Sequence, residues 1–422
     1  MQWVDAAVAA EAVGSTSTSP RVVVSGNHGT PWLLLNAIDA TLPEYRLWAL
    51  NPQRGIPDRD GVTLETCFVG PGMRGSERLR YLPSRLSLVP VLFRESLRPD
   101  AVVVQVSRVV DGKVSLGTEV NILPSAIEQC RGAGGTVVAQ VNEHMPYTFG
   151  DGELDVDAFD FMVRADQPLH DVAPIPLDDI ALSIGDRVAH RVPDGATVQL
   201  GIGSVPDASL PGVAQRRGLK IWSEMVSDGV LTLFERGSLD TDVPVTASFV
   251  FGSQRLYDWV DRNPLVQILR TETTNSPAEI AARPLMVSVN AALQVDLFGQ
   301  ANASRINNRI YSGFGGQTDF IVGALHSKGG QALIAMHSWH PKGNASTIVP
   351  LIDEPVTSFQ HSAVITEHGV AAIWGYAQQE QALNLIGHAA HPDVRDELYE
   401  EAVALSLVPP SSGGPPGRIA AQ

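Results

Sequence analysis

The chain has 422 residues, too many for one ordinary hydrophobic core, and 44% of them are hydrophobic, which is enough for two or three globular domains. Its formal net charge is −16 without a basic cluster, which argues against nucleic acids and anionic membranes as partners and favours small molecules. The apolar runs are far shorter than the roughly 20 residues that cross a bilayer, and the N-terminus lacks the basic region of a secretory signal. We therefore expect a cytoplasmic protein.

Short β-branched segments alternate with longer helical patterns, which is typical of α/β units with parallel sheets. The segments with the composition of strands are 21–25, 100–107, 136–141, 197–200, 219–223, 245–250, 285–290, 331–336 and 362–367. An amphipathic helix pattern begins near residue 180 and leads into a new strand, so we place a domain boundary there. The predicted domains are 1–178 and 179–408, followed by a mobile tail, 409–422, rich in Pro, Gly and Ser.

The two predicted domains also contain a loose internal repeat. A strand runs into "SGNHGTPWLLLNAI" (25–38) in the first and into "LGIGSVPDASLPGV" (200–213) in the second. Both stretches read as a strand, a glycine-rich loop, a proline and a helix. We expect two similar open α/β domains with largely parallel sheets that face each other.

The second glycine-rich loop, Gly201-Ile202-Gly203-Ser204-Val205, follows a predicted strand and precedes a predicted helix. Its glycines would let a ligand approach the backbone, and the helix N-terminus would offer amides to an anion. It lacks the third glycine of a dinucleotide-binding fingerprint, and no Lys-Ser/Thr pair follows it. A tight structural turn explains the local pattern equally well.

A carboxylate, Glu224, follows the predicted strand 219–223 at the start of the next helical pattern. Read locally, it is a helix-entry residue of the kind that stabilises a helix by roughly 0.3–1 kcal/mol. The carboxyl ends of neighbouring parallel strands, however, meet at the edge where ligands bind in open α/β folds. Because the loop 201–205 and Glu224 end consecutive strands, we expect them to share one crevice.

Three further patterns could mark a site. The segment 311–320 places Gly313, Gly315 and Gly316 within four positions, as a ligand contact or a tight connection between buried elements would require. The histidine pairs "HSWH" (337–340) and "HAAHPD" (388–393) lack an obvious third ligand, so no metal site is predicted. His28, in the first glycine-rich loop, reads as a turn residue or as part of a cleft wall.

Taken in order, these stretches resemble the acetyl-CoA hydrolase/transferase family, the branch of CoA-transferases that includes 4-hydroxybutyrate and acetate CoA-transferases. In the first half the matching segments are 68–74, 81–93, 114–120 and 141–151. In the second half they are 200–208, 223–229, 295–302, 311–324, 364–375 and 390–398. The resemblance covers the chain from about residue 20 to 405 and implies two CoA-transferase-like α/β domains with the active site at their interface.

The resemblance also implies roles for individual residues. Glu224 matches the family's nucleophilic glutamate, in a Ser/Thr-Glu-Met/Val stretch about two dozen residues after a Gly-x-Gly loop. The residues that match its coenzyme A contacts are Gly201, Ile202, Gly203, Ser204, Val205, Ser312, Gly315 and Gly316. The implied substrates are an acyl-CoA and a carboxylic acid, with no tightly bound cofactor and no metal, and the family expectation is a homodimer.

The sequence leaves three functions open: CoA transfer through a glutamyl-CoA thioester, acyl-CoA hydrolysis by the same glutamate, and non-catalytic acyl-CoA binding. The third is motivated by positions that depart from the family pattern. Thr347 and Gln360 stand where relatives carry arginine, and Gln294 stands where glutamate is frequent, in a region expected to border the substrate. Lys328 is a candidate contact for the phosphates of coenzyme A. The acyl group itself remains open.

Overall fold

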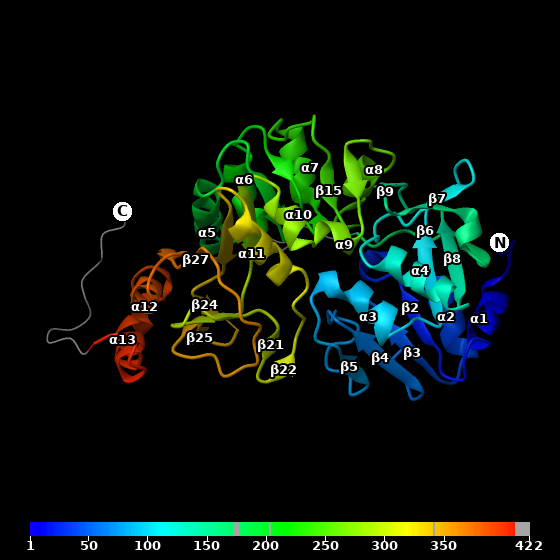
Figure 1. Ribbon diagram of the computed structural model, residues 1–422, viewed down its shortest axis with the longest axis horizontal. Helices are drawn as coiled ribbons and strands as arrows, with labels where there is room; N and C mark the ends of the chain where they lie inside the picture. Colours follow the sequence, from blue (N-terminus) through cyan, green and yellow to red (C-terminus); the bar gives the residue numbers. More distant parts are fainter. Residues whose placement is uncertain (172–176, 202–203, 341, 410–422) are drawn as a thin grey trace.

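The computed structural model describes residues 1–171, 177–201, 204–340 and 342–409, and it places the two halves of the chain side by side (Figure 1). Each half is built on one main sheet covered by helices. The first half, coloured blue to cyan, lies to the right in Figure 1, and the second, coloured green to red, lies to the left. The expected α/β class with largely parallel sheets is confirmed.

The first sheet has eight strands, all of which pair in parallel. Their order is β1 (Gln2–Trp3), β11 (Phe161–Ala165), β8 (Thr136–Asn142), β6 (Ala101–Val106), β2 (Arg21–Val24), β3 (Tyr45–Trp48), β4 (Val62–Thr66) and β5 (Leu79–Tyr81). Helices α1 (Ala6–Gly14) and α2 (Trp32–Thr41) cover one face, and α3 (Val89–Glu95) and α4 (Leu123–Gly132) cover the other. Alternate valines of β2 enter the two opposite cores, which explains its uninterrupted apolar run.

The second sheet has six strands, and its pairs are parallel except for the antiparallel pair at the edge. Their order is β13 (Lys220–Ile221), β12 (Thr197–Leu200), β18 (Met286–Asn290), β23 (Gln331–Ala335), β27 (Ala363–Thr366) and β28 (Gly369–Ala372). Helices α5 (Asp179–His190) and α6 (Ser204–Val213) pack on one face. Helices α10 (Pro277–Ala281) and α11 (Gln317–His326) pack on the other.

The central strands of the two sheets have the same order. In the first half, β3, β4 and β5 lie on one side of β2, and β6, β8 and β11 lie on the other. In the second half, β13 lies on one side of β12, and β18, β23, β27 and β28 lie on the other. The strand order therefore reverses between β2 and β6, and again between β12 and β18. In open α/β sheets, ligands bind at such a reversal, beyond the carboxyl ends of the strands.

Shorter elements surround the sheets. The paired strands are β7 (Lys113–Ser115) with β10 (Glu153–Asp155), β14 (Met225–Val226) with β16 (Phe249–Val250), β21 (Arg305–Ile306) with β22 (Arg309–Ile310), and β24 (Trp339–His340) with β25 (Ala345–Ser346). A three-stranded sheet joins β20 (Ala301–Asn302), β19 (Gln294–Asp296) and β26 (Ile348–Val349). The remaining helices are α7 (Asp228–Glu235), α8 (Gln254–Val260), α9 (Thr271–Thr274), α12 (Gln378–Asn384) and α13 (Arg395–Ala404).

The two halves share a small sheet and a hydrophobic core. Strand β9 (Phe149–Gly150), from the first half, extends the pair of β15 (Val245–Ala247) and β17 (Val266–Ile268), from the second. One apolar cluster continues from the first sheet through this contact into the second half. The strands of the first sheet precede residue 178 in the sequence, and those of the second follow it. The domain boundary predicted at that residue stays a prediction.

Each predicted strand segment contains strand residues, but 219–223 is shorter than expected. Strand β13 ends at Ile221, and Trp222 instead forms a bridge with Thr246. The chain changes partners at this point, from β12 to β15, so Glu224 lies in a connection that leads into β14 and only then into α7. The segment 245–250 is likewise divided into β15 and β16.

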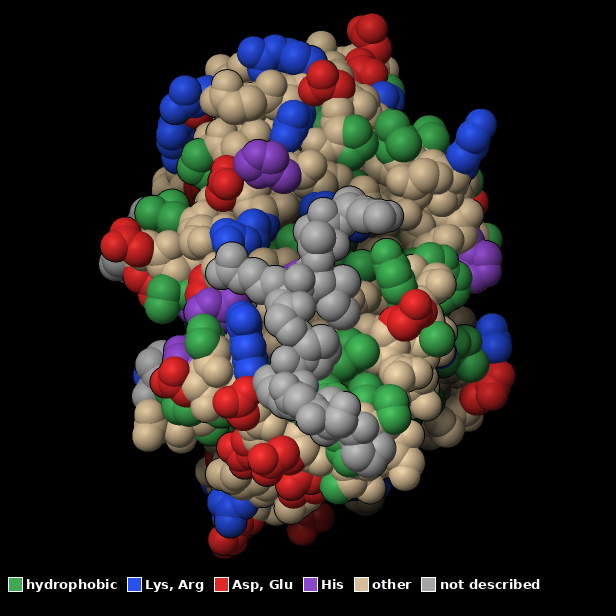
Figure 2. Space-filling model, turned by 90° about the vertical axis from the view of Figure 1, so that its left-hand side faces the viewer, with side chains coloured by type: hydrophobic (Ala, Val, Ile, Leu, Met, Phe, Trp, Pro, Cys, Tyr) green, Lys and Arg blue, Asp and Glu red, His purple; other side chains and the backbone are tan. Residues whose placement is uncertain are grey.

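No helix in the described part of the chain is long and apolar enough to cross a membrane. The face formed by the second half, turned toward the viewer in Figure 2, intersperses Lys and Arg with Asp and Glu. Both cysteines, Cys67 and Cys130, are buried and free.

The close contact between α5 and α6 generates a first prediction. A Cβ atom added to Gly185 would lie 2.3 Å from the backbone of Ala208, so Gly185→Ala must push the two helices apart. We expect the free energy of unfolding to fall by about 1–3 kcal/mol in urea titrations, despite the better helix propensity of alanine. Gly132→Ala, at a helical glycine with no atom within 4 Å of the added carbon, is the control. Equal unfolding midpoints for the two variants would contradict this packing.

Candidate active site

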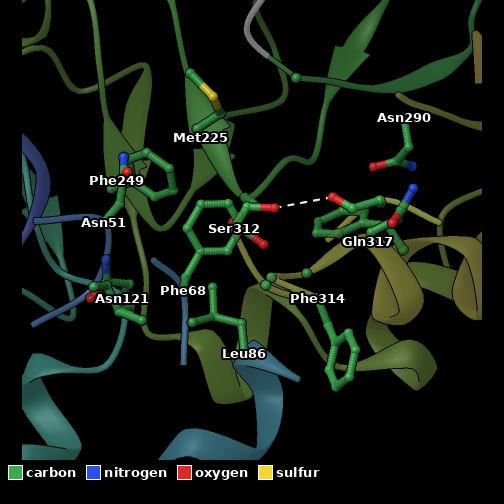
Figure 3. Close-up of a pocket in the computed structure, with 18 of the residues that line it drawn as sticks. Asn51, Phe68, Leu86, Asn121, Met225, Phe249, Asn290, Ser312, Phe314 and Gln317 are labelled. Carbon is green, nitrogen blue, oxygen red and sulfur yellow. Dashed lines mark hydrogen bonds between the residues drawn. The ribbon is translucent and has the colours of Figure 1, made fainter. Parts of the chain in front are cut away.

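A cavity of about 260 Å³ lies between the carboxyl edges of the two sheets. Gly201 follows β12 and Asn290 ends β18, while Asn27 and Asn51 follow β2 and β3. In Figure 3, Asn51, Asn121, Phe68 and Leu86 lie at the left and below, and Asn290 and Gln317 lie at the right. The cavity therefore occupies the strand-order reversal of both halves, where a ligand is expected.

Glu224 and Gly201 both line this cavity, so the expected shared crevice is confirmed for these two residues. The backbone around Glu224 is held by the segment before β16. The Glu224 carbonyl oxygen accepts hydrogen bonds from the Ser248 amide at 2.9 Å, the Ser248 hydroxyl at 2.8 Å and the Phe249 amide at 3.2 Å. These contacts fix the base of the side chain while its carboxylate faces the cavity.

The Glu224 carboxylate is bound by an amide that the sequence did not reveal. Asn275 Nδ2 donates to Glu224 Oε2 at 2.9 Å, and the Asn275 side chain is oriented by the Thr274 hydroxyl, which donates to its Oδ1 at 2.9 Å. Asn275 is fully buried. The segment "TETTNSP" around it has no local catalytic pattern, so only the fold brings it to the glutamate.

Burial raises the pKa of Glu224 to about 7 because the cavity edge desolvates its ionised form. The hydrogen bond from Asn275 and the amide of Gly316 oppose this increase, while the negative charge of Asp319 adds to it. Asp319, in the first turn of α11, is itself fully buried and accepts hydrogen bonds from the hydroxyl and amide of Ser87 at 2.8 and 3.2 Å. Glu224 is thus a carboxylate whose charge can change near neutral pH.

Each of the three glycines in the 313–316 turn is required for a different structural reason. A Cβ on Gly313 would lie 2.4 Å from the carbonyl oxygen of Cys67, and Gly315 has a φ of 54° beside the ring of Phe68. A Cβ on Gly316 would lie 1.8 Å from Glu224 Oε2. The turn is therefore a tight connection and also a wall of the site.

Some of the other predicted coenzyme A contacts line the cavity and others do not. Ser312 lines the cavity with Gly315 and Gly316, and its hydroxyl donates to the Ala303 carbonyl at 3.0 Å (Figure 3). Ile202 and Gly203 lie outside the described residues. Ser204 begins α6, and the side chain of Val205 packs into the hydrophobic core instead of lining the cavity. The coenzyme A roles of these residues stay predictions.

A second carboxylate lies behind the opposite wall of the cavity. Glu119, in the segment between β7 and α4, is 1% exposed, and burial raises its pKa to about 7, to which the charge of Glu224 contributes. Asn27 Nδ2 lies 3.0 and 2.9 Å from its two oxygens, and Asn121 Nδ2 lies 2.7 Å from Oε1. The sequence "VSLGTEV" indicated a family segment but gave no reason to single out this glutamate.

Other positions singled out in the sequence lie away from the cavity. Lys328 follows the end of α11, whereas the start of that helix borders the site. None of the three departures from the family pattern lines the described cavity, and the expectation that they border the substrate stays a prediction. Thr347 is buried and donates to the His337 carbonyl at 2.6 Å, and Gln360 lines a separate surface pocket with Trp374.

His28 lines a neighbouring cavity that shares Asn27 with the first. Its ring stacks on Phe251 at 4.1 Å between centroids, and its Nδ1 lies 3.0 Å from the Tyr257 hydroxyl. Burial lowers its pKa to about 4, so it is neutral at physiological pH. Within the described residues, no group of three His, Cys, Asp or Glu side chains could hold a metal ion.

Known proteins match this chain over nearly its whole length. The 4-hydroxybutyrate coenzyme A transferase of Clostridium kluyveri is 36% identical over 418 residues, covering 93% of this chain and 96% of that protein. The succinyl-CoA:acetate/propanoyl-CoA:succinate CoA transferase of Fasciola hepatica is 34% identical over 427 residues, covering 95% and 88%. The crystal structure of RipA from Yersinia pestis matches with a TM-score of 0.89 at 28% identity, covering 96% and 98%.

The profile of the acetyl-CoA hydrolase/transferase C-terminal domain matches residues 252–402, which carry Asn275 and the glycine turn beside Glu224. The resemblance drawn from the sequence motifs is therefore confirmed. The chain belongs to the acetyl-CoA hydrolase/transferase family.

Proposed function

We propose that this protein is a CoA-transferase that moves coenzyme A from a short-chain acyl-CoA to a carboxylic acid through a glutamyl-CoA thioester on Glu224. The observation that carries the proposal is the placement of the Glu224 carboxylate, which faces the cavity while Asn275 Nδ2 holds one of its oxygens at 2.9 Å. The family supports it, because relatives over nearly the whole chain are named CoA-transferases.

The first half-reaction would form an anhydride. A Glu224 oxygen attacks the thioester carbonyl carbon, a C–O bond forms, and the C–S bond breaks to release the CoA thiolate. A carboxylate is a weak nucleophile, so the reaction depends on holding the thioester against it. Apolar side chains of Phe68, Met225 and Phe249 on the cavity wall support this by limiting the access of water.

The second step would transfer coenzyme A to the enzyme. The thiolate attacks the Glu224 carbonyl carbon, a C–S bond forms, and the anhydride C–O bond breaks to release the free acid. Negative charge then develops on the glutamyl oxygen, which Asn275 already faces. Losing one such donor typically costs about 2.7–4 kcal/mol in the transition state. An incoming carboxylate reverses both steps and leaves as the new acyl-CoA.

Hydrolysis is the competing outcome at the same glutamate, because water can replace the incoming acid. The family description includes hydrolases. The transferase is favoured by the apolar wall and by relatives that name an acid as acceptor.

Replacing the nucleophile tests the proposal directly. We expect Glu224→Gln to fold normally but to form no covalent coenzyme A adduct when incubated with acetyl-CoA or butyryl-CoA and analysed by intact mass. Glu279→Gln is the matched control, because Glu279 on α10 is exposed and, among the described residues, forms one ion pair, with Arg283 just after the helix.

The wild-type protein should release free thiol slowly from acyl-CoA until a carboxylic acid is added, which then yields a new acyl-CoA. An adduct that survives in Glu224→Gln would overturn the assignment of the nucleophile. Rapid thiol release that is independent of any acid would establish the hydrolase instead.

The glycine beside the nucleophile gives a second test. In Gly316→Ala, the added carbon would lie 1.8 Å from Glu224 Oε2 and 2.3 Å from Asn275 Nδ2, so the carboxylate must leave its amide partner. We expect kcat to fall at least 100-fold, about the loss of one oxyanion donor. Gly387→Ala, where no atom lies within 4 Å of the added carbon, should retain activity. Wild-type kcat in Gly316→Ala would refute this geometry.

The pH dependence of adduct formation follows from the sign of the pKa shift. Burial holds Glu224 protonated below about 7, and only the carboxylate is nucleophilic. In single-turnover measurements with excess acyl-CoA, we expect the rate to rise about tenfold per pH unit below 7 and to level off above it. A rate already constant from pH 5 upward would show that Glu224 ionises as an ordinary surface carboxylate does.

A further inference from the structure

A buried carboxylate behind the nucleophile, Asp319, takes no part in the transfer steps above. It lies in the first turn of α11, and its neighbours in the sequence, Gln317 and Phe320, line the cavity. An acidic residue in that turn can stabilise a helix through the macrodipole alone. Such a residue is ordinarily solvated, whereas Asp319 is 0% exposed, and burying a carboxylate costs free energy unless specific partners compensate. The partners of Asp319 therefore indicate what it does.

The first half of the chain binds this carboxylate through a short segment between β5 and α3, residues 85–87. The Ser87 hydroxyl donates to Asp319 Oδ1 at 2.8 Å, and the Ser87 amide donates to Oδ2 at 3.2 Å. The Leu86 amide donates to the carbonyl oxygen of Gly315 at 2.9 Å. The segment 85–87 therefore holds both the glycine turn and Asp319 of the second half.

On its other side, Asp319 interacts with the amide that binds Glu224. The Asn275 side chain favours the ionised form of Asp319, as a hydrogen-bond donor does. Its Oδ1 can only accept and is bound by the Thr274 hydroxyl, so Nδ2 is the donor. One N–H of Nδ2 is directed to Glu224 Oε2, which leaves the second for Asp319. The amide of Asn275 thus lies between two carboxylates.

Two carboxylates fix the orientation of this amide more firmly than one. If the Asn275 amide turned over, its Oδ1 would face the oxygens of Glu224 and Asp319 together. Buried acceptors without donors are unfavourable, so the turned orientation is excluded from two sides. The amide that would stabilise the glutamyl oxyanion is therefore held in place before the reaction begins.

Asp319 also brings a negative charge to the nucleophile, and this charge opposes the ionisation of Glu224. Among the described residues, the other charged groups that act on this pair are Arg85 and Glu119. Arg85 Nη1 lies 4.0 Å from Asp319 Oδ1, but its side chain is 40% exposed, so solvent screens its effect. Glu119 lies across the cavity and interacts with Glu224 as a second negative charge.

From these contacts, and resting on the proposed transfer of coenzyme A, we infer that Asp319 is a positioning residue that couples the first half of the chain to the nucleophile. Ser87 holds the Asp319 carboxylate, and this carboxylate holds the Asn275 amide against Glu224. The reactivity of Glu224 therefore depends on the contact that the segment 85–87 makes with the second half, outside the cavity itself.

Replacing the carboxylate tests this role. In Asp319→Asn, one acceptor oxygen remains for three donors, so we expect the plateau rate of adduct formation with acetyl-CoA to fall at least tenfold in single-turnover measurements. We also expect the midpoint of the pH profile to move down by at least half a unit, because the charge that opposes ionisation of Glu224 is removed. A merely structural role would lower the plateau without moving the midpoint, and that result would overturn the inference.

Asp296→Asn is the matched control for this variant. Asp296, in β19, is also buried and also accepts hydrogen bonds from three donors, the backbone amides of Phe298, Gln300 and Ile352. It does not line the described cavity. We expect its replacement to change neither the pH midpoint nor the plateau by more than twofold. A midpoint that moves equally in both variants would show that the shift is not specific to Asp319, which would also overturn the inference.

The link to the first half is tested by Ser87→Ala, which removes the hydroxyl donor and keeps the amide. We expect the plateau rate to fall at least threefold while the acetyl-CoA concentration that gives half the plateau changes less than twofold. Ser338→Ala is the control, because the amide and hydroxyl of Ser338 bind the Glu367 carboxylate in the same way and neither residue lines the described cavity. An unchanged plateau in Ser87→Ala would overturn the coupling.

The double variant of Ser87→Ala and Asp319→Asn separates coupling from two independent effects. If Ser87 acts through Asp319, the double variant should react within twofold of Asp319→Asn alone, whereas multiplied losses would overturn the inference. If Asp319→Asn does not fold, the plateau of Ser87→Ala decides. A wild-type protein that forms no adduct would refute the proposed function, whereas wild-type adduct formation with unaffected variants would refute the coupling alone.

Discussion

The site depends on one carboxylate, Glu224, at the edge of the protein interior, where the described residues that line its cavity include no lysine or arginine. Each pKa unit corresponds to about 1.4 kcal/mol, so a pKa near 7 means that ionising Glu224 in place costs roughly 3 kcal/mol more than in water. Asn275 offsets part of that cost with a hydrogen bond to Glu224. Gly316 leaves room for this hydrogen bond because it has no side chain. With a pKa of about 7, Glu224 is about half ionised at neutral pH, and its ionised form is poorly solvated, which is the state in which a carboxylate is reactive.

The fold explains why the partners of Glu224 come from distant segments. The same strand order in the two halves creates two strand-order reversals, and the shared core holds them edge to edge. One half supplies the glutamate, its amide donor and the glycine turn, while the other supplies apolar and amide side chains. The glutamate proposed as nucleophile and the asparagines of the opposite wall thus come from different halves of the chain.

Local sequence patterns predicted much of the fold because fully buried parallel strands are continuous β-branched runs. The segment 197–200 is reproduced residue for residue, and the helix expected near 180 is α5. Strands such as β3 (Tyr45–Trp48) and β4 (Val62–Thr66) were missed because charged residues interrupt their apolar pattern. The buried ion pair of Arg21 and Glu65, at 2.7 Å, is what allows such a charge inside the sheet.

The sequence predicted those parts of the site that lie within one continuous motif. It did not predict contacts between side chains that are far apart in the sequence. Glu224 and the glycine turn follow from local motifs and the resemblance, whereas Asn275 lies 51 positions from Glu224 in a segment with no motif. Glu119 and Asn51 are equally invisible, since an isolated glutamate or asparagine is ordinarily a surface residue. That the lost arginines border the substrate stays a prediction, because position along a motif does not tell which way a side chain faces.

The use of amides around both buried carboxylates has a chemical consequence. A lysine or arginine in place of Asn275 would form an ion pair with Glu224 and lower its pKa, making the carboxylate fully charged but less nucleophilic. It would also bind the released carboxylate product strongly. In the proposed mechanism an amide donor would stabilise the oxyanion of each step without neutralising the nucleophile, and amides of asparagines likewise bind Glu119 behind the opposite wall. Hydrogen bonds from amides therefore bind both carboxyl groups without adding a positive charge to the site.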